Sequence, residues 1–150
     1  MEFYNLLIKK AKEDGIEKIA VGGVILNSNN EVLLLTRKLN DFMGGIDEFP
    51  SGNLEENEGL YEGLLREIKE ETNLDVSKVY NYINSFDYLS GSGKKARQYN
   101  FSLNADLNNE IKLSEHDFYK WWSIEDAINN SKITKEVKHT LEIYCFNLRS

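Results

Sequence analysis

Cysteine, proline and long apolar runs are scarce in this sequence. Cys145 is the only cysteine among 150 residues, which excludes an internal disulfide and any zinc site built on several thiolates. A reducing cytoplasm therefore suits the chain. No stretch approaches the ~18 apolar residues of a membrane span, and the first residues, MEFYNLLIKKAKEDG, mix charges into a short apolar group. We expect neither a membrane helix nor a secretion signal.

Positive charge is also in short supply. Lys and Arg total 18 against 25 Asp and Glu, which gives a formal net charge of -7. Because binding to a nucleic-acid polymer depends largely on Lys and Arg contacts to phosphate, the sequence predicts no such partner. A local acidic site could still recruit Mg²⁺ and, through the ion, a small phosphorylated substrate.

The rest of the composition is typical of one globular domain. Hydrophobic residues make up 41% of the chain, and 150 residues can bury an ordinary core, so we expect a single domain over residues 1–150. Apolar periodicity and turn residues predict an α+β fold with helices outside a sheet. The expected helices cover residues 3–15, 58–72 and 133–148, with a further helix capped by Ser123, and the expected strands cover residues 19–26, 32–35, 46–49, 79–89, 96–107 and 118–122. Turn clusters predict two β-hairpins, around residues 27–30 and 90–93.

The most distinctive segment is the acidic helix expected at residues 58–72. Glu67, Glu70 and Glu71 are spaced i, i+3 and i+4, so their carboxylates must project from one face. Like charges this close raise each other's pKa and cost stability unless a cation neutralises them. Oxygen ligands on a rigid helix suit Mg²⁺ or Mn²⁺, which also bridge substrate phosphates. The alternative is a plain acidic helix with i,i+4 charge pairs and no metal.

The segment Gly52–Leu74 reads GNLEENEGLYEGLLREIKEETNL and resembles the Nudix box. In that pattern glycine is followed after five residues by glutamate and after seven more by REUxEExGU, where U is aliphatic. Only Asn73 departs, standing where the pattern has glycine, and Asn is the next best residue for a left-handed helix end. The resemblance implies a Nudix α/β/α sandwich with a mixed β-sheet between helices, plus short N-terminal and C-terminal helices.

The resemblance also implies roles for residues of this segment. A divalent metal would be held by the carbonyl of Ser51 and the carboxylates of Glu67, Glu70 and Glu71. Glu67 or Glu70 would accept the proton of an attacking water, and Arg66 would orient these carboxylates. Gly52 would allow the backbone to approach metal or phosphate closely.

Two further segments extend the resemblance. The run LLLTRKLNDFMGGIDEFPSG is similar to MutT-type Nudix hydrolases, which makes Arg37 and Phe49 candidate substrate contacts, although burial of Phe49 in the core is an equal alternative. The run LSEHDFYKWWSIEDA resembles the late strand of the family, in which Glu115 matches an acid that completes the metal site. Asp117 could substitute for it. We expect His116 to be a loop histidine, because hard cations prefer oxygen.

The implied reaction is metal-dependent hydrolysis of a nucleoside-diphosphate-linked substrate, with Mg²⁺ or Mn²⁺ as cofactor. The preferred substrate is a nucleoside triphosphate, plain or modified, cleaved to a monophosphate and pyrophosphate by a monomer or homodimer. Alternatives are a nucleotide sugar, a non-catalytic nucleotide-sensing role, or a dinucleoside polyphosphate stacked on Tyr82 and Tyr88. The basic residues Lys94, Lys95 and Arg97 could contact phosphates, although a solvated hairpin end is favoured.

Overall fold

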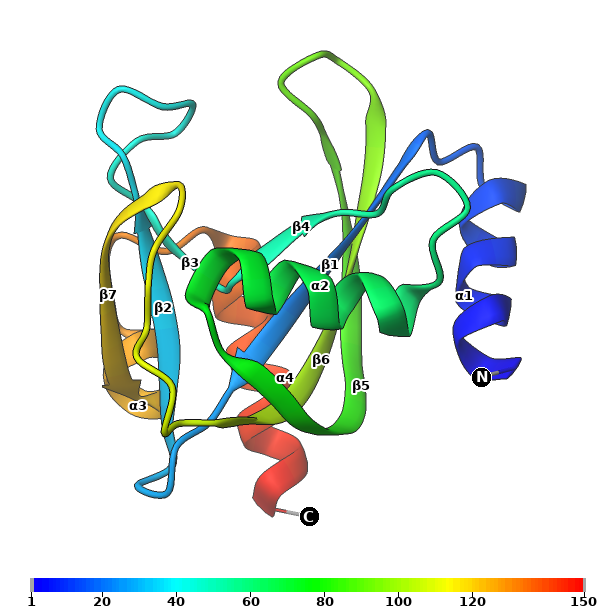
Figure 1. The fold of residues 1–150 in the computed structure, drawn as a ribbon. Coiled ribbons are helices and arrows are strands. Elements are labelled where there is room, and N and C mark those ends of the chain that lie inside the picture. The colour runs from blue at the N-terminus through cyan, green and yellow to red at the C-terminus, as the bar shows by residue number, and fades with distance from the viewer. Residues whose placement is uncertain (1, 150) are drawn as a thin grey trace.

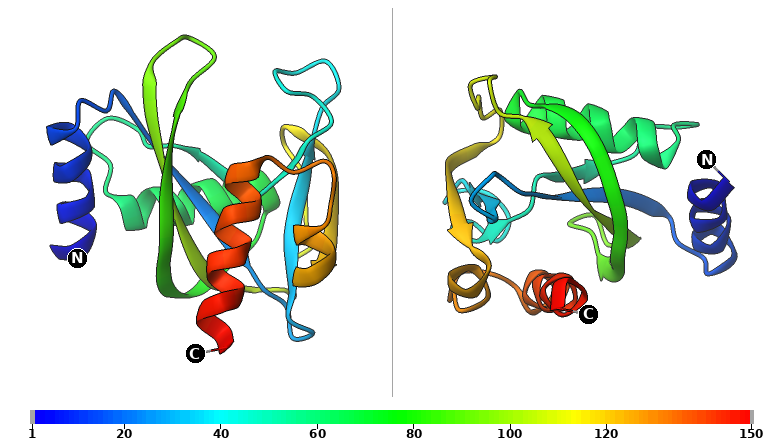
Figure 2. Two further views of the ribbon diagram at one scale, coloured as in Figure 1. Left: turned by 180° about the vertical axis from the view of Figure 1, so that it is seen from behind. Right: turned by 90° about the horizontal axis from the view of Figure 1, so that it is seen from below.

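In the computed structural model, which describes residues 2–149 and side chains as far as Asn147, helices lie on both sides of the β-strands (Figure 1, Figure 2). The helices are α1 (Glu2–Glu13), α2 (Leu60–Thr72), α3 (Ile124–Ile128) and α4 (Lys135–Arg149). The strands are β1 (Lys18–Ile25), β2 (Glu31–Arg37), β3 (Asp47–Glu48), β4 (Ser51–Asn53), β5 (Asp75–Leu89), β6 (Lys95–Asp106) and β7 (His116–Ser123). The predicted α+β sandwich is confirmed.

The strands form two sheets where the sequence predicted one. The first has the order β4-β1-β6-β5 and is mixed, because β1 runs parallel to β6 and antiparallel to β4. The second has the order β3-β2-β7 and is antiparallel. The predicted hairpin around residues 27–30 is therefore wrong, since β1 and β2 lie in different sheets and meet at a single bridge, between Leu26 and Val32. The hairpin of β5 and β6 is confirmed.

Helix α2 packs on the four-stranded sheet through an apolar stripe. Leu60, Leu64 and Ile68 recur every fourth residue and are fully buried in a cluster with strand residues such as Val21 and Phe101. Each buried side chain of this size stabilises the fold by roughly 2 kcal/mol. The stripe fixes the rotation of the helix about its axis, and with it the direction of the glutamates. The helix ends at Asn73, whose φ of 67° is the predicted left-handed conformation.

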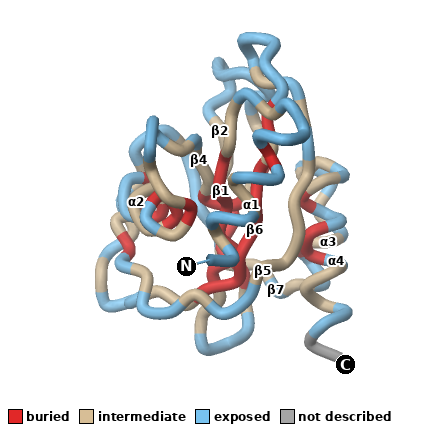
Figure 3. Tube along the Cα trace, turned by 90° about the vertical axis from the view of Figure 1, so that its right-hand side faces the viewer, coloured by how far each residue is buried: buried red, intermediate tan, exposed pale blue. Residues whose placement is uncertain are grey.

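The opposite side of the strands is covered by α3 and α4, as the view from below shows (Figure 2). A second core lies there, with Val24, Val32 and Leu34 packed against Val137 and Leu141. Buried residues accordingly concentrate in the strands and on the inner sides of the helices (Figure 3). No helix within the described residues is long and apolar enough to cross a membrane.

Candidate functional site

The carboxylates of α2 border a hollow of about 270 Å³, beside β4 and the loop before β7. The hollow is lined by Ser51, Gly52, Asn53, Glu67, Glu70, Glu71, Ser114 and Glu115. Every residue predicted to hold metal is in this set. Asp117, the alternative acid, lies on β7 outside the set, so the geometry favours Glu115 for this place.

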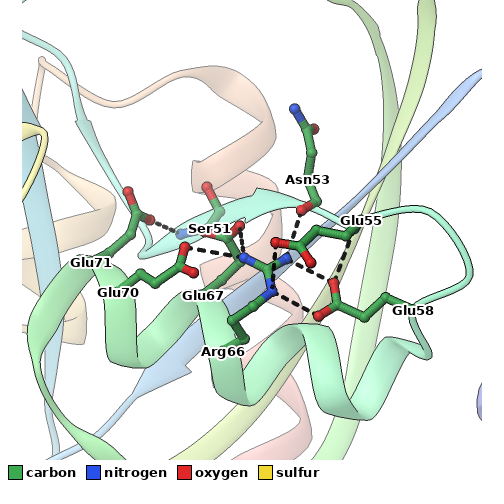
Figure 4. A network of polar contacts seen from close by, with 8 residues as sticks. All are labelled: Ser51, Asn53, Glu55, Glu58, Arg66, Glu67, Glu70 and Glu71. Carbon is green, nitrogen blue, oxygen red and sulfur yellow. Dashed lines mark hydrogen bonds and ion pairs between the residues drawn. The ribbon is translucent and has the colours of Figure 1, made fainter.

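Arg66 binds two carboxylates of its own helix and Glu58 of the preceding loop (Figure 4). Its Nε and Nη2 each donate to an oxygen of Glu58 at 2.7 Å, and its Nη1 donates to Glu67 at 2.9 Å and to Glu70 at 3.1 Å. Nη2 also donates to the carbonyl of Asn53 at 3.0 Å. The bond to Arg66 lowers the pKa of Glu58, and the same bond raises the pKa of Arg66, which stays protonated. Arg66 thus makes the contacts expected of a residue that orients these carboxylates.

Two carboxylates of the hollow are withdrawn from water. Glu71 is 7% exposed and its Oε1 accepts the N–H of Ser51 at 2.6 Å. Burial raises the pKa of Glu71 to about 7 in spite of that bond. Burial also raises the pKa of Glu67, against the opposing effect of Arg66. A nearby cation would favour the ionised form of both groups.

The hollow fits a hard divalent cation. Its donors are carboxylate, carbonyl and hydroxyl oxygens, which Mg²⁺ and Mn²⁺ prefer. Gly52 lies so close to Glu67 that a Cβ would collide with the carboxylate, so any larger residue here would displace the Glu67 side chain from its present position. Within residues 2–149, no three acidic, histidine or cysteine side chains already converge as a ligand set, and Arg66 engages Glu67 and Glu70. An ion would therefore compete with Arg66 for these oxygens.

His116 is the residue of this region that the sequence reasoning misjudged. It begins β7 and its side chain is 6% exposed, so the predicted loop histidine is wrong. Its Nε2 lies 2.9 Å from Oε2 of Glu48, and its Nδ1 lies 3.6 Å from Oε2 of Glu71. Burial acts to lower the pKa of His116, but the bond to Glu48 and the charge of Glu71 raise it overall. Extending the strand expected at residues 118–122 by two residues would have placed His116 in the sheet.

A larger cleft of about 580 Å³ adjoins the hollow. The two share Ser51, Gly52, Asn53, Glu71 and Glu115. The loop before β3 and the end of the β5–β6 hairpin border the cleft, and both project from the same side of the molecule (Figure 1). Arg37 lines the cleft, where its Nε donates to Glu48 and its Nη1 to the carbonyl of Phe42, both at 2.9 Å.

Phe49 borders the cleft but is only 1% exposed and packs in the second core. A ring buried to this degree cannot stack on a ligand without repacking of the core. The burial therefore supports the core alternative for Phe49.

The predicted basic cluster does not act as a unit. Arg97 donates to Asp87 at 2.7 Å and to Asp14 at 2.9 Å, so its positive charge is already neutralised by these two carboxylates. The lining of the cleft, over the described part of the chain, does not include Lys94 or Lys95. The solvated hairpin end is the alternative that these contacts support.

Comparisons with known proteins agree with this geometry. The family model described as the NUDIX domain matches residues 17–143. The chain is 46% identical over 56 residues to the 8-oxo-dGTP diphosphatase of Proteus vulgaris, which covers 37% of this chain and 50% of that protein, so the chain spans about half the length of that relative. It is 32% identical over 122 residues to the asymmetrical bis(5'-nucleosyl)-tetraphosphatase of Mus musculus, covering 77% of this chain and 79% of that protein.

Solved structures show the same fold. The MutT protein from Methanosarcina mazei Go1 superposes with a TM-score of 0.76 at 25% identity, over 89% of this chain and 96% of that one. A C. elegans Ap4A hydrolase binary complex gives a TM-score of 0.73 at 23% identity, over 88% of this chain and 98% of that one. The family model matches most of this chain, and Glu67, Glu70 and Glu71 of the Nudix-box segment lie on helix α2 beside β4. This chain therefore belongs to the Nudix family.

Proposed function

We propose that this protein is a pyrophosphohydrolase that depends on Mg²⁺ or Mn²⁺ and cleaves a nucleoside-diphosphate-linked substrate. One observation carries the proposal: the acidic hollow opens into a cleft of about 580 Å³. That volume is within the range of roughly 300–1,000 Å³ typical of small-molecule sites. The diphosphate would lie at the hollow and the rest of the substrate in the cleft.

The residues that would hold the metal are Ser51, through its carbonyl, and Glu67, Glu70, Glu71 and Glu115. When bound, the ion would supply positive charge to the phosphate oxygens and favour ionisation of a water. Glu67 and Glu70 are the candidates to take the proton of that water. Burial raises the pKa of Glu67, so this carboxylate binds a proton more tightly than an exposed glutamate does.

Two arginines have separate tasks in this proposal. Arg66 holds one oxygen of Glu67 and one of Glu70, which limits the orientations these carboxylates can adopt. Arg37 lines the cleft and would contact the substrate, with Glu48 fixing its guanidinium. Because Glu48 also binds His116, which lies beside Glu71, the position of Arg37 is coupled to that of a metal ligand.

The preferred substrate is a nucleoside triphosphate, converted in the cytoplasm to a monophosphate and pyrophosphate. The 8-oxo-dGTP diphosphatase relative supports this choice, and the net charge of -7 disfavours a polymer. A dinucleoside polyphosphate is the second candidate, because the Mus musculus relative is a tetraphosphatase and Tyr88 lines the cleft. Tyr82 does not serve that candidate, since it packs on Phe101 in the first core.

A panel of nucleoside triphosphates, their 8-oxo forms and dinucleoside tetraphosphates tests the proposal. Each compound would be incubated with the protein and Mg²⁺ or Mn²⁺, and the products identified by chromatography. We expect a monophosphate and pyrophosphate from at least one triphosphate. A preference for dinucleoside tetraphosphates would favour the second candidate. If no compound is cleaved with either metal, the proposed function is wrong.

A further inference from the structure

One row of residues crosses the four-stranded sheet and forms part of the floor of the cleft. The strand register aligns Asn53 on β4, Ala20 on β1, Gln98 on β6 and Phe86 on β5, and all four line the cleft. Residues aligned across neighbouring strands point to the same face of a sheet. Because Ala20 has the smallest side chain of the row, it leaves room between the amides of Asn53 and Gln98.

Gln98 is held in this row by a ladder of amides. It is 8% exposed, and its Nε2 donates to Oδ1 of Asn100 at 2.8 Å. Nδ2 of Asn100 donates to Oδ1 of Asn84 at 3.1 Å, and the hydroxyl of Thr140 on α4 donates to the same oxygen at 3.1 Å. A Cβ at Gly22 would lie 2.5 Å from both the Asn100 and the Gln98 amides, so glycine makes room for the ladder.

The ladder decides which part of Gln98 faces the cleft. One N–H of its amide donates to Asn100, and among the hydrogen bonds of the described residues none engages its Oε1, so this oxygen is free to accept a hydrogen bond in the cleft that Gln98 lines. An amide fixed in one orientation inside a protein selects a partner, because an unmatched group costs the free energy of its lost hydration. Gln98 therefore offers a fixed hydrogen-bond acceptor.

An aromatic surface lies beside this acceptor. Phe86 is aligned with Gln98 on the neighbouring strand, and its ring centroid is 5.9 Å from that of Tyr88, which also lines the cleft. Phe42 and Met43, which are 62% and 48% exposed, line the cleft from the loop before β3. A planar heterocycle is bound by contacts of this kind, with its faces against aromatic side chains and its edge against an amide.

The distance from the hollow suits the same ligand. Neighbouring strands lie about 4.8 Å apart, so Gln98 on β6 is roughly 10 Å from β4, which borders the hollow. That separation is comparable to the length of a nucleoside. A phosphate chain at the hollow would place the attached base near β6.

We infer that Gln98 reads the edge of the nucleobase, and that the substrate carries a base with an N–H donor on that edge, such as the exocyclic amino group of adenine or cytosine. The inference rests on the proposed function, because it assigns the base end of the same site. A base without such a donor leaves Oε1 of Gln98 unpaired and binds more weakly.

Binding of nucleoside monophosphates tests the inference without any hydrolysis. Calorimetry would compare AMP with purine riboside 5'-monophosphate, and CMP with 2-pyrimidinone riboside 5'-monophosphate, two pairs that differ by the amino group. We expect the amino member of at least one pair to bind the native protein roughly tenfold more tightly. Gln98→Met, which keeps the length of the side chain, should remove that difference. Asn104→Met, on the same strand and face but outside the cleft, should retain it.

Equal binding within both pairs would overturn the inference, as would a difference that survives Gln98→Met. The comparison of ligands uses the native protein, so it stands even if Gln98→Met fails to fold. A base preference without hydrolysis of any compound of the nucleotide panel would contradict the proposed function and leave the role of Gln98 intact. Hydrolysis without a base preference would support the proposed function and overturn the role inferred for Gln98.

Discussion

The acidic hollow and the floor of the cleft adjoin one another but depend on the chain in different ways. The hollow takes most of its carboxylates from a single helix, at Glu67, Glu70 and Glu71, so helical periodicity alone brings them together. The floor takes one residue from each of four strands, among them Gln98 and Phe86, and exists only when the register of the whole sheet is in place. The proposed reaction is thus encoded locally, whereas the choice of substrate depends on long-range pairing.

The two regions also differ in how their polar groups are satisfied. In the hollow, burial raises the pKa values of Glu67 and Glu71, so folding works against their charge. At the floor, Gln98 donates to Asn100, and Asn100 in turn donates to Thr140. Carboxylates whose pKa values are raised by burial, as in the hollow, are typical of ligand-binding sites. The hydrogen-bonded ladder that holds Gln98 is instead rigid before any ligand binds.

The largest effect should follow a change in the hollow. Glu70→Gln keeps the volume of the side chain and removes a ligand charge, so we expect kcat to fall roughly 100-fold or more. The Glu70 side chain is 56% exposed, and the melting temperature should change little. Glu62→Gln is the matched control, since it removes the same charge from an exposed position of α2 outside the hollow. Near-normal turnover in Glu70→Gln would separate the hollow from the chemistry.

A second change should stabilise the protein. Burial raises the pKa of Glu71 from 4.5 to about 7, so the folded state binds this proton more tightly than the unfolded chain. Its contribution to stability is complete below pH 4.5 and is lost as the pH rises through about 7. In chelator at pH 8, Glu71→Gln should therefore unfold with a free energy about 3 kcal/mol higher than the native protein. Urea titrations at pH 8 and pH 4.5 measure this, and an equal difference at both would refute it.

A third pair of variants distinguishes Glu115, in the loop before β7, from Asp117, on that strand. Glu115 lines the hollow and Asp117 does not, so Glu115→Gln should lower kcat about tenfold at saturating Mg²⁺ while Asp117→Asn leaves it unchanged. Steady-state kinetics of the two variants decide between them. A Glu115 variant with native turnover would remove this residue from the site.

The smallest effect should come from the hairpin. Arg97 already pairs with Asp87 and Asp14, whose side chains are 56% and 32% exposed, and ion pairs with carboxylates open to water contribute little. Arg97→Gln should lower the melting temperature by a few degrees at most and leave kcat/KM unchanged. A marked rise in KM for nucleotides would instead assign Arg97 to phosphate binding.

The sequence predicted what depends on local spacing. The helix expected at residues 58–72, the left-handed Asn73 and the β5–β6 hairpin follow from periodicity and turn residues, and the structure confirms them, with the helix beginning two residues later, at Leu60. The division into two sheets was missed, because turn residues show where the chain reverses and not which strands pair. His116 and Gln98 were missed for the same reason, since their partners Glu48, Glu71 and Asn84 come from other elements.

The central claim is that the carboxylates of α2 act through a divalent metal. The most direct test is turnover of a nucleoside triphosphate by chelator-treated protein as Mg²⁺ is added back. We predict no turnover in chelator, saturable recovery with Mg²⁺, and a higher Mg²⁺ requirement in Glu70→Gln than in Glu62→Gln. Full turnover in chelator, or the same Mg²⁺ requirement in both variants, would contradict the claim.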